Sequence, residues 1–307
     1  MDFLVTGGAG FIGSHLVEHL VSYGHGVTVI DNLHTGNKEN LKHVINQIEF
    51  VSGDIKDYEL LRKLFKNKNG VFHEAALASV QESFTKQKEY HDVNVNGTEN
   101  ILKIAKEFGI KVVYASSSSV YGNPTKIPIK EDAKRNPINP YAQTKLEDEC
   151  LAEKYAKKGV SVIGLRYFNV FGERQSNEYA GVIKLFLERI QQQKSPLVNG
   201  DGLQTRDFVY VGDVVNANIL AMKSQLRQGF INIGSGNSIS ILELAKTVIK
   251  SSGLPLKPIH KPALEGDVRE TKADITLAKK LLSWEPKTKL EDWLDKVISK
   301  MKIEAKH

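Results

Sequence analysis

The sequence has 307 residues, of which 41% are hydrophobic and 25% charged, so the chain can bury a full core without disulfides or a structural metal ion. Its only cysteine, Cys150, excludes internal disulfides and cysteine-based metal clusters and is typical of a reducing compartment, by default the cytoplasm. The net charge of +6 is spread along the chain without a run of five basic residues, and no apolar stretch reaches the roughly 18 residues of a membrane span, so we expect neither nucleic acid nor membrane as a partner.

Short apolar runs alternate with helix-length amphipathic segments through the first half of the chain. This repeated strand–helix–strand pattern predicts an α/β fold with a doubly wound parallel sheet, which binds ligands at the carboxyl ends of its strands. The predicted strands are 3–6, 26–30, 48–52, 70–73, 111–115 and 161–165, and the predicted helices are 12–22, 57–65, 90–108 and 141–157.

The rhythm changes after Arg166, where longer connections indicate that a second, smaller α/β region begins. Segments 208–211 and 230–233, with the helix after Asp213, are expected to return to the sheet. We therefore predict a nucleotide-binding domain formed by 1–166 and about 207–235. A substrate-binding domain is predicted from about 167–206 and 236–307, with helices at 241–250 and 290–300.

The first predicted strand leads into a glycine-rich turn. Gly7, Gly10 and Gly13 have the spacing that permits a tight turn, close approach of a pyrophosphate to a helix N-terminus, and close helix–strand packing. A turn without any ligand is the alternative. Asp31 ends the second strand, where a carboxylate can bind an adenosine ribose and repel a 2′-phosphate, although it could instead cap the next turn. The ordered set predicts a Rossmann-type site for NAD rather than NADP.

A tyrosine and a lysine lie four residues apart on one face of a predicted helix. An ammonium group on Lys145, together with a nicotinamide cation, would favour the phenolate form of Tyr141 and so make it a base. Alone, the pair could be solvated on an exposed helix. Four serines at 116–119 directly follow the strand 111–115, which places hydroxyl groups at the ligand-binding edge, although they could form a polar loop.

Together these motifs resemble the extended short-chain dehydrogenase/reductase family, and within it the nucleotide-sugar epimerase branch, over nearly the whole chain. The resemblance implies that Tyr141 is the acid/base and that Lys145 positions the nicotinamide ribose and promotes ionisation of Tyr141. Counting back from Tyr121 identifies Ser117 as the residue that hydrogen-bonds the reacting oxygen.

The resemblance extends to segments 53–55, 73–77, 94–98, 165–172 and 204–209, and it implies no metal site. The implied cofactor-binding residues are Gly7, Gly10, Phe11, Ile12, Gly13, Asp31, Asn32, Gly36, Asp54, Ile55, Ala75, Ala76, Leu77, Asn94, Ser116, Tyr141, Lys145 and Phe168. The implied substrate-binding residues are Ser79, Ser117, Ser118, Tyr141, Asn169, Leu197, Val198, Asn199, Arg206, Arg269 and Thr271.

The residues expected to bind the diphosphate match the family pattern only in part. The resemblance implies that Arg206 binds the diphosphate, although Arg206 could instead pair with Asp207 or another carboxylate. Most relatives have an arginine where this chain has Leu264, so one phosphate contact is missing, and Arg269 or Lys261 could replace it.

The sugar is expected to be neutral or N-acetylated. Dehydratases and decarboxylases of the family have acidic residues at the positions of Ser118 and Ser119, although serines there also suit epimerases of uronic acids. Segment 168–175 resembles that of epimerases acting on UDP-glucose, UDP-galactose and their 2-acetamido analogues. Thr271 stands where a tyrosine would close the pocket to N-acetyl groups; the alternative is that it caps a helix beginning at Ala273.

The expected reaction is inversion of a UDP-hexose at C4 through a transient 4-keto sugar, with NAD regenerated. Alternatives are a uronic acid 4-epimerase, an oxidoreductase that releases a keto sugar, and a non-catalytic NAD-binding module. The helices predicted at 90–108 and 141–157 resemble the pair that forms a four-helix dimer interface in the family, although they could simply cover the sheet. A homodimer is therefore expected.

Overall fold

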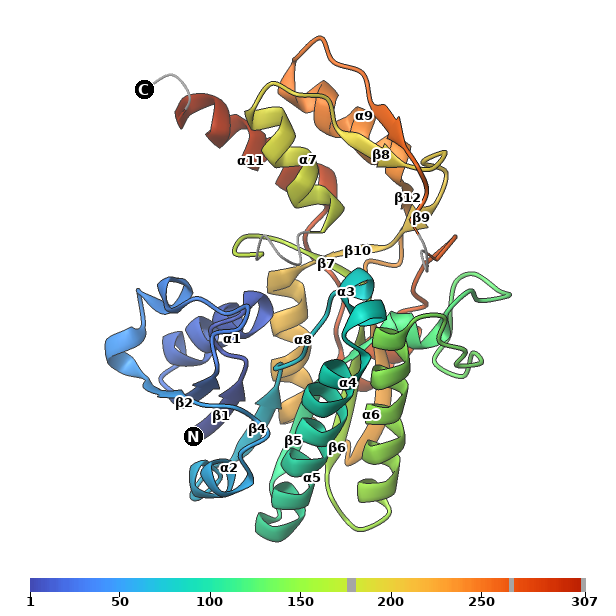
Figure 1. Ribbon diagram of the computed structural model, residues 1–307. Helices are drawn as coiled ribbons and strands as arrows, with labels where there is room; N and C mark the ends of the chain where they lie inside the picture. The colour runs from blue at the N-terminus through green and yellow to red at the C-terminus, as the bar shows by residue number, and fades with distance from the viewer. Residues whose placement is uncertain (176–180, 265–267, 305–307) are drawn as a thin grey trace.

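The computed structural model describes residues 1–175, 181–264 and 268–304. At its centre is a seven-stranded, all-parallel sheet with the strand order β11-β6-β5-β4-β1-β2-β3 (Figure 1). The chain builds outward from β1 to β3 and then crosses to β4, so the order reverses between β1 and β4 and leaves a crevice at their carboxyl ends. The predicted doubly wound sheet is confirmed. Its strands are β1 (Asp2–Thr6), β2 (Gly26–Asp31), β3 (Glu49–Ser52), β4 (Gly70–His73), β5 (Lys111–Ser117), β6 (Val162–Tyr167) and β11 (Gln228–Ile233).

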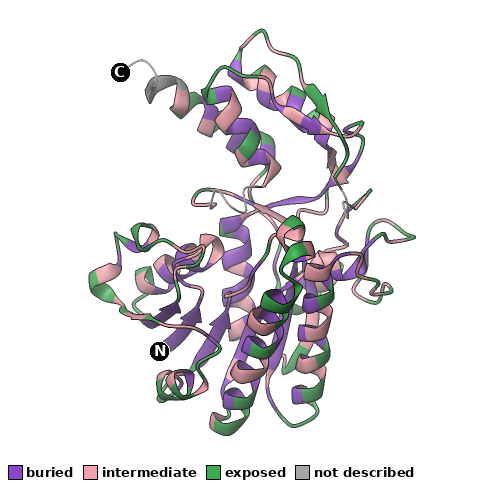
Figure 2. Cartoon of the chain, viewed as in Figure 1, coloured by how far each residue is buried: buried purple, intermediate pink, exposed green. Residues whose placement is uncertain are grey.

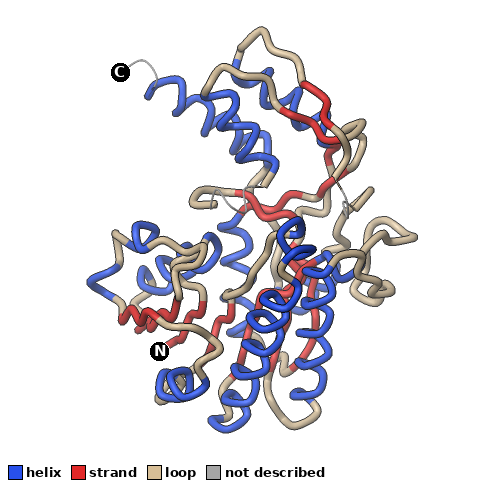
Figure 3. Tube along the Cα trace, in the orientation of Figure 1, coloured by secondary structure: helices blue, strands red, loops and turns tan. Residues whose placement is uncertain are grey.

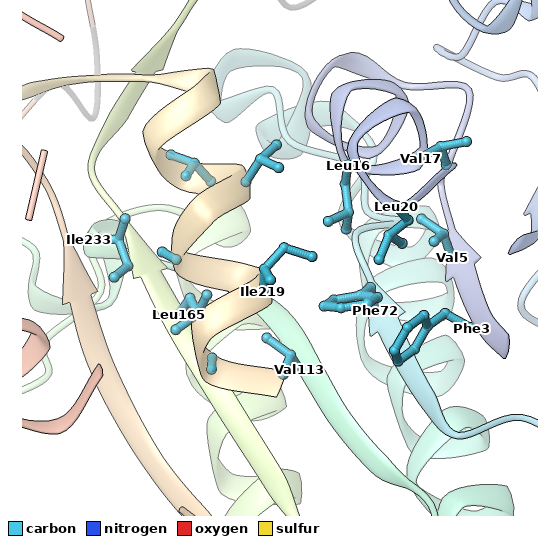
Figure 4. Packing of buried hydrophobic residues seen from close by; sticks show 14 of the residues in the cluster. Phe3, Val5, Leu16, Val17, Leu20, Phe72, Val113, Leu165, Ile219 and Ile233 are labelled. Atoms are coloured by element: carbon cyan, nitrogen blue, oxygen red, sulfur yellow. The ribbon is translucent and has the colours of Figure 1, made fainter. Parts of the chain in front are cut away.

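Helices cover both faces of the sheet, which explains why the central strands β4 and β6 are buried throughout. Figure 4 shows one of these layers, in which Ile219 lies over Leu165 and Val113 of the sheet. The helices on this face are α1 (Phe11–Ser22), α8 (Val211–Lys223) and α10 (Thr276–Leu282), and those on the other face are α2 (Tyr58–Leu64), α5 (Gly97–Phe108) and α6 (Pro140–Ala156).

A second region lies beyond the carboxyl edge of the sheet, as the tube in Figure 3 shows. Its three helices share an apolar cluster that includes Phe186, Leu244 and Leu294. Three two-stranded sheets accompany them. The helices are α7 (Val182–Gln191), α9 (Ile241–Ser252) and α11 (Leu290–Glu304), and the strand pairs are β7 (Asn169–Phe171) with β10 (Phe208–Tyr210), β8 (Leu197–Asn199) with β13 (Ile259–Lys261), and β9 (Thr205–Arg206) with β12 (Ile239–Ser240).

One expectation about the sheet is wrong. Segment 208–211 does not return to it. The strand beside β6 is β11, and β10 pairs instead with β7, which follows β6 in the chain beyond the carboxyl edge of the sheet. The segment at 230–233 does join the sheet, as part of β11. The two-domain division remains a prediction.

The helix predicted at 90–108 is present without a break, but it is not α-helical throughout. It consists of α4 (Gln87–Tyr90), a π-helical segment η3 (His91–Asn96) and then α5. The other short elements are α3 (Val80–Thr85) and the 3-10 helices η1 (Lys38–Leu41), η2 (Ile45–Gln47) and η4 (Ser118–Tyr121). No helix in the described part of the chain combines the length and the apolar character that crossing a membrane requires.

Candidate active site

A cavity of about 510 Å³ lies where β1, β2 and β4 end, between the sheet and the second region. From the second region, Val182, Ile183 and Phe208 line it. Most of the predicted cofactor-binding residues also line it, namely Gly7, Gly10, Phe11, Ile12, Gly13, Asp31, Asn32, Asp54, Ile55, Ala75, Ala76 and Leu77.

The glycine turn fits a pyrophosphate. Gly7 has a φ of +67°, and a Cβ there would lie 2.7 Å from the backbone nitrogen of Ala75. A Cβ at Gly13 would lie 2.2 Å from the Gly7 carbonyl oxygen, so only glycine lets α1 begin so close to the strand. Gly10 is the N-cap of α1 and makes no side-chain cap, which leaves backbone N–H groups of the first turn directed at the cavity edge.

Asp31 is held rigidly at the end of β2. Its carboxylate accepts hydrogen bonds from the backbone N–H groups of Ala9 (2.9 Å) and Leu33 (2.8 Å), while burial raises its pKa. Gly36 packs against this carboxylate, since a Cβ at Gly36 would lie 2.7 Å from an Asp31 oxygen. The group is thus placed to accept hydrogen bonds from the two hydroxyls of a ribose.

Tyr141 and Lys145 come from the first two turns of α6. The helix begins there because Asn139 caps it, accepting a hydrogen bond from the Ala142 N–H (2.8 Å), and because Pro140 follows. The Lys145 ammonium is buried and donates to the Ala115 carbonyl (3.1 Å) and to Asp148 (3.2 Å).

Lys145 stays protonated in this setting. Burial opposes its charge, but Asp148 and Tyr141 outweigh that effect and raise the pKa of Lys145. Burial in turn raises the pKa of Asp148 to about 6, against the pull of the lysine. A cation next to Tyr141 is therefore maintained at neutral pH.

The serines at the end of β5 serve different purposes. Ser117 caps η4, and its Oγ accepts from the Ser119 hydroxyl (2.8 Å) and N–H (3.2 Å). The Ser116 hydroxyl points inward and donates to Glu149 (2.7 Å). Because Lys145, one turn after Tyr141, donates to the Ala115 carbonyl near the end of β5, the Ser117 end of β5 and the N-terminal half of α6 lie at the same edge of the sheet. The next element, η4, which includes Ser118, also packs against α6.

Asn94 connects the cofactor loop to α6. Its side chain accepts from the Leu77 N–H (2.8 Å) and donates to the Leu77 carbonyl (3.0 Å) and the Thr144 hydroxyl (2.9 Å). It lies in the π-helical segment η3, a kind of irregularity that often marks a functional site. Asn94 thus positions the loop instead of lining the cavity.

The other residues predicted to touch the nicotinamide or the reacting sugar lie outside the cavity lining. Phe168 is buried in a small cluster with Val120, Tyr121 and Ile129. The described residues that line the cavity do not include Phe168, Asn94, Ser116, Ser117, Tyr141 or Lys145.

A buried ion pair fixes α6 to the sheet. Arg166 of β6 donates to both carboxylate oxygens of Glu149 (2.7 and 2.8 Å), which also accepts from Arg135 (3.0 Å). Arg166 further donates to the Tyr121 hydroxyl (2.7 Å), which in turn donates to Asn232 (2.7 Å). Glu149 and Arg166 are almost completely buried.

The predicted substrate residues at the sheet edge have definite partners. Asn169 begins β7, lines the cavity and donates to the Asp207 carbonyl (3.2 Å). Ser79 caps α3 by accepting from the Glu82 N–H (3.1 Å). The positions of the Asn169 and Ser79 side chains are therefore set by these hydrogen bonds.

Leu197, Val198 and Asn199 form β8, and Val198 is buried. Residues 265–267, which follow Leu264, lie outside the described residues.

Asp207, one of the carboxylates with which Arg206 could pair, accepts hydrogen bonds from other residues. The Asp207 carboxylate accepts four hydrogen bonds, two from Ser235 and one each from the N–H groups of Gly236 and Ala273. Arg206 is buried and donates to the Thr205 carbonyl (2.7 Å). Arg269 instead forms an exposed ion pair with Asp201 (3.1 Å).

Thr271 does not cap a helix, so that alternative is wrong. The next helix, α10, begins only at Thr276. Thr271 is buried, and its hydroxyl accepts from the Asp207 N–H (3.2 Å), next to Arg206.

A model of the NAD dependent epimerase/dehydratase family matches residues 3–234. The chain belongs to this family. The resemblance seen in the sequence is thereby confirmed, and the protein is an NAD-dependent enzyme of the epimerase/dehydratase type.

Relatives of this epimerase/dehydratase cover almost its whole length. A solved UDP-glucose 4-epimerase from Thermotoga maritima with UDP-glucose is 37% identical, with a TM-score of 0.94 and coverage of 99% of this chain and 100% of that chain. A UDP-N-acetylglucosamine 4-epimerase from Methanobrevibacter ruminantium, in complex with UDP-N-acetylmuramic acid, is 35% identical, with a TM-score of 0.93 and coverage of 99% and 98%. A UDP-N-acetyl-alpha-D-glucosaminuronate decarboxylase from Bacillus cytotoxicus is 37% identical and covers 96% of both chains.

Sequence reasoning missed two buried acids of this epimerase/dehydratase, Asp148 and Glu149. Both lie in α6, three and four residues after Lys145, on its buried side. Their spacing was a usable signal, because acids at these positions share a helix face with the lysine. Sequence alone did not show that the face is buried.

Proposed function

We propose that this enzyme inverts a UDP-hexose at C4 through a transient 4-keto sugar. One observation carries the proposal. The Ser117 end of β5 and the first turn of α6, which holds Tyr141 and the buried charged Lys145, meet at the sheet edge that borders the dinucleotide cavity. Such an arrangement provides an acid/base, a fixed cation and a hydroxyl beside a hydride carrier.

Each residue has a separate task in the proposed reaction. Bound NAD supplies a hydride acceptor that later returns the hydride. Tyr141 takes the proton from the sugar O4 and gives it back, and Ser117 hydrogen-bonds the same oxygen. Lys145, held by the Ala115 carbonyl and Asp148, stabilises the ionised tyrosine and binds the nicotinamide ribose. Rotation of the keto sugar about its diphosphate presents the opposite face, so the returned hydride inverts C4.

The second region supplies the proposed contacts with the UDP moiety. Arg206 suits the diphosphate because a guanidinium fork matches phosphate oxygens. The strand of Leu197, Val198 and Asn199 would hold the uracil, and Asn169 and Ser118 would contact the sugar nucleotide. Arg269 can contact the diphosphate only if it gives up its ion pair with Asp201. Because that ion pair is exposed, breaking it costs little free energy.

A UDP-uronic acid 4-epimerase is the second candidate, because Ser118 and Ser119 are compatible with a carboxylated sugar. The same two serines argue against dehydration and decarboxylation, although a decarboxylase is among the relatives. An intact set of Ser117, Tyr141 and Lys145 argues against a non-catalytic NAD-binding module.

A substrate panel tests these proposals. The purified enzyme is incubated with UDP-glucose, UDP-galactose, their 2-acetamido analogues and UDP-glucuronic acid, the products are separated, and NADH absorbance is followed. C4-inverted products of neutral sugars without net NADH support the proposal. Inversion of the uronic acid alone supports the second candidate, and net NADH formation indicates an oxidoreductase.

We expect NAD to bind more tightly than NADP, because Asp31 lines the cavity at the proposed position of the adenosine ribose, where a 2′-phosphate would meet its carboxylate. Titration with both cofactors checks this expectation, with Asp31→Ser as the variant in which the preference should shrink. Equal affinity of the unaltered enzyme for the two cofactors would remove this role of Asp31.

We expect activity on UDP-N-acetylhexosamines as well as UDP-hexoses, because the resemblance to the family places the smaller Thr271 where a tyrosine would close the pocket to N-acetyl groups. Thr271→Tyr should suppress turnover of the N-acetylated substrate and spare UDP-galactose. Thr271→Ser retains the hydroxyl that accepts from the Asp207 N–H and serves as the control. If both activities of Thr271→Tyr fall alike, or the unaltered enzyme ignores N-acetylated sugars, the pocket assignment is wrong.

We also propose a homodimer formed through α5 and α6. Both helices pack on the sheet with one face and leave exposed residues on the other (Figure 2). Sedimentation velocity measurements distinguish a dimer from a monomer.

A further inference from the structure

Glu74 is a half-buried acid that the proposed reaction does not use. It directly follows β4, and its N–H donates to the Thr6 carbonyl (3.2 Å). His73 points the opposite way, towards Thr98 of α5 (2.9 Å), because successive side chains of a strand alternate between the faces of a sheet. Glu74 therefore lies on the α8 side of the sheet, at its centre.

Only half of the Glu74 carboxyl group is satisfied. Oε1 accepts from the Tyr167 hydroxyl (3.0 Å), which in turn accepts from the Asn218 amide (2.7 Å). Oε2 is buried and has no hydrogen-bond partner among the described residues. A buried acceptor without a hydrogen-bond donor raises the free energy of the folded protein. A ligand bound in the cavity could lower this free energy by placing a donor or a positive charge next to Oε2.

Glu74 lines the cofactor cavity. It does so together with Gly7 and Ala75, which border the proposed pyrophosphate site. Tyr167, its hydrogen-bond donor, directly precedes Phe168. Lys145, the proposed ribose contact, is close enough to influence Glu74 electrostatically. These neighbours place the carboxyl group towards the nicotinamide end of a cofactor that lies across β1 and β4.

The surroundings let Glu74 change charge near neutral pH. Burial raises the pKa of Glu74 to about 7, against the effects of the Tyr167 hydrogen bond and the Lys145 charge. One other nearby acid, Asp148, titrates in a similar range, because burial raises its pKa to about 6, so the comparison with Glu74→Gln is needed to assign the effect to Glu74. Burial lowers the pKa of His73 to about 3, and the pKa of Lys145 is raised.

We propose that Glu74 is a positioning residue for the nicotinamide end of NAD, and that its carboxylate favours the oxidised, positively charged ring over the reduced, neutral ring. This inference rests on the proposed function, which places the nicotinamide beside Lys145. The physical reason is that a charge pair within a dry cavity interacts much more strongly than in water. No bond to Glu74 forms or breaks, and only its proton occupancy responds to the cofactor.

The sign of the pH dependence follows from this preference. If NAD favours the ionised form, the pKa of Glu74 is lower in the NAD complex than in the NADH complex. Exchange of NADH for NAD then releases a proton, so a rise in pH through about 7 strengthens NAD binding relative to NADH binding. The ratio of the two affinities changes by at most about tenfold for each unit by which the two pKa values differ.

The test uses the Tyr141→Phe background, which lacks the hydroxyl of the proposed acid/base. NADH affinity is measured from nicotinamide fluorescence and NAD affinity by competition, at several pH values from 5.5 to 8.5. We expect Kd(NADH)/Kd(NAD) to rise about three- to tenfold over this range. Adding Glu74→Gln should abolish most of the rise, whereas adding Glu107→Gln, on the exposed surface of α5, should leave it intact.

A second variant covers the case in which Glu74→Gln folds poorly. Tyr167→Phe removes the hydrogen bond that stabilises the ionised form, so the midpoint of the pH dependence should move to higher pH. An unchanged rise in Glu74→Gln, or an unmoved midpoint in Tyr167→Phe, overturns the role of Glu74. The proposed function would survive that result, because it is judged separately by the sugar panel with the unaltered enzyme.

Discussion

Tyr141→Phe is expected to lower kcat for C4 inversion about 100- to 10,000-fold, the usual contribution of a general acid/base. The hydrogen bonds that the structure shows for Tyr141 use its backbone, from the N–H to Ser83 and from Thr144 to the carbonyl. Loss of the side-chain hydroxyl should therefore leave the fold intact. The measurement is initial-rate turnover of UDP-galactose, with NAD affinity and thermal unfolding as controls.

Ser117→Ala should show a smaller loss of the same kind, because it removes one hydrogen bond to the reacting oxygen and leaves the base in place. Near-normal turnover by Tyr141→Phe would refute the acid/base assignment. A loss that is accompanied by equally weakened NAD binding would point to a binding role instead.

Arg166→Met is expected to reduce the free energy of unfolding by about 3–5 kcal/mol, because it leaves Glu149 buried and deprived of its bidentate partner. Arg135 also reaches Glu149, and its side chain is only 28% exposed, so part of the charge remains compensated. Urea denaturation followed by circular dichroism gives the change. Arg62→Met, which breaks an ion pair at the surface, is the matched control and should have a much smaller effect.

The double variant Arg166→Met with Glu149→Met separates two explanations. If the uncompensated charge of Glu149 causes the loss, removing that charge should restore part of the stability. If the double variant is less stable than Arg166→Met by a further full increment, the two residues contribute independently and the argument fails.

The local pattern of the sequence predicted much of this structure. All six strands predicted up to Leu165 are present within a few residues, because buried parallel strands read as short apolar runs between glycine turns and helices. Likewise, Gly7 and Gly13 lie where a turn and a close contact require them, and Asp31 ends β2 as predicted.

Long-range partners could not be predicted in this way. The pairings of β10 with β7 and of β11 with β6 join distant segments of the chain, which no local pattern specifies. The inward turn of the Ser116 hydroxyl depends on Glu149, 33 residues away. Similarly, Asp148 differs from a surface acid only by its burial, which is decided by the packing of α6 on the sheet.

The ion pair between Glu149 and Arg166 also sets the rotation of the helix that carries the proposed chemistry. Tyr141, Lys145 and Glu149 follow one another at intervals of four residues, so they form a single stripe along α6. Because one residue of an α-helix corresponds to about 100° of rotation, an insertion or deletion between Lys145 and Glu149 would turn Tyr141 away from Ser117 while the core pair stayed in place. Residues outside the stripe, such as the exposed Cys150, are free of this constraint. Substitutions on the outer surface of α6 should therefore leave the orientation of Tyr141, the proposed acid/base, unchanged.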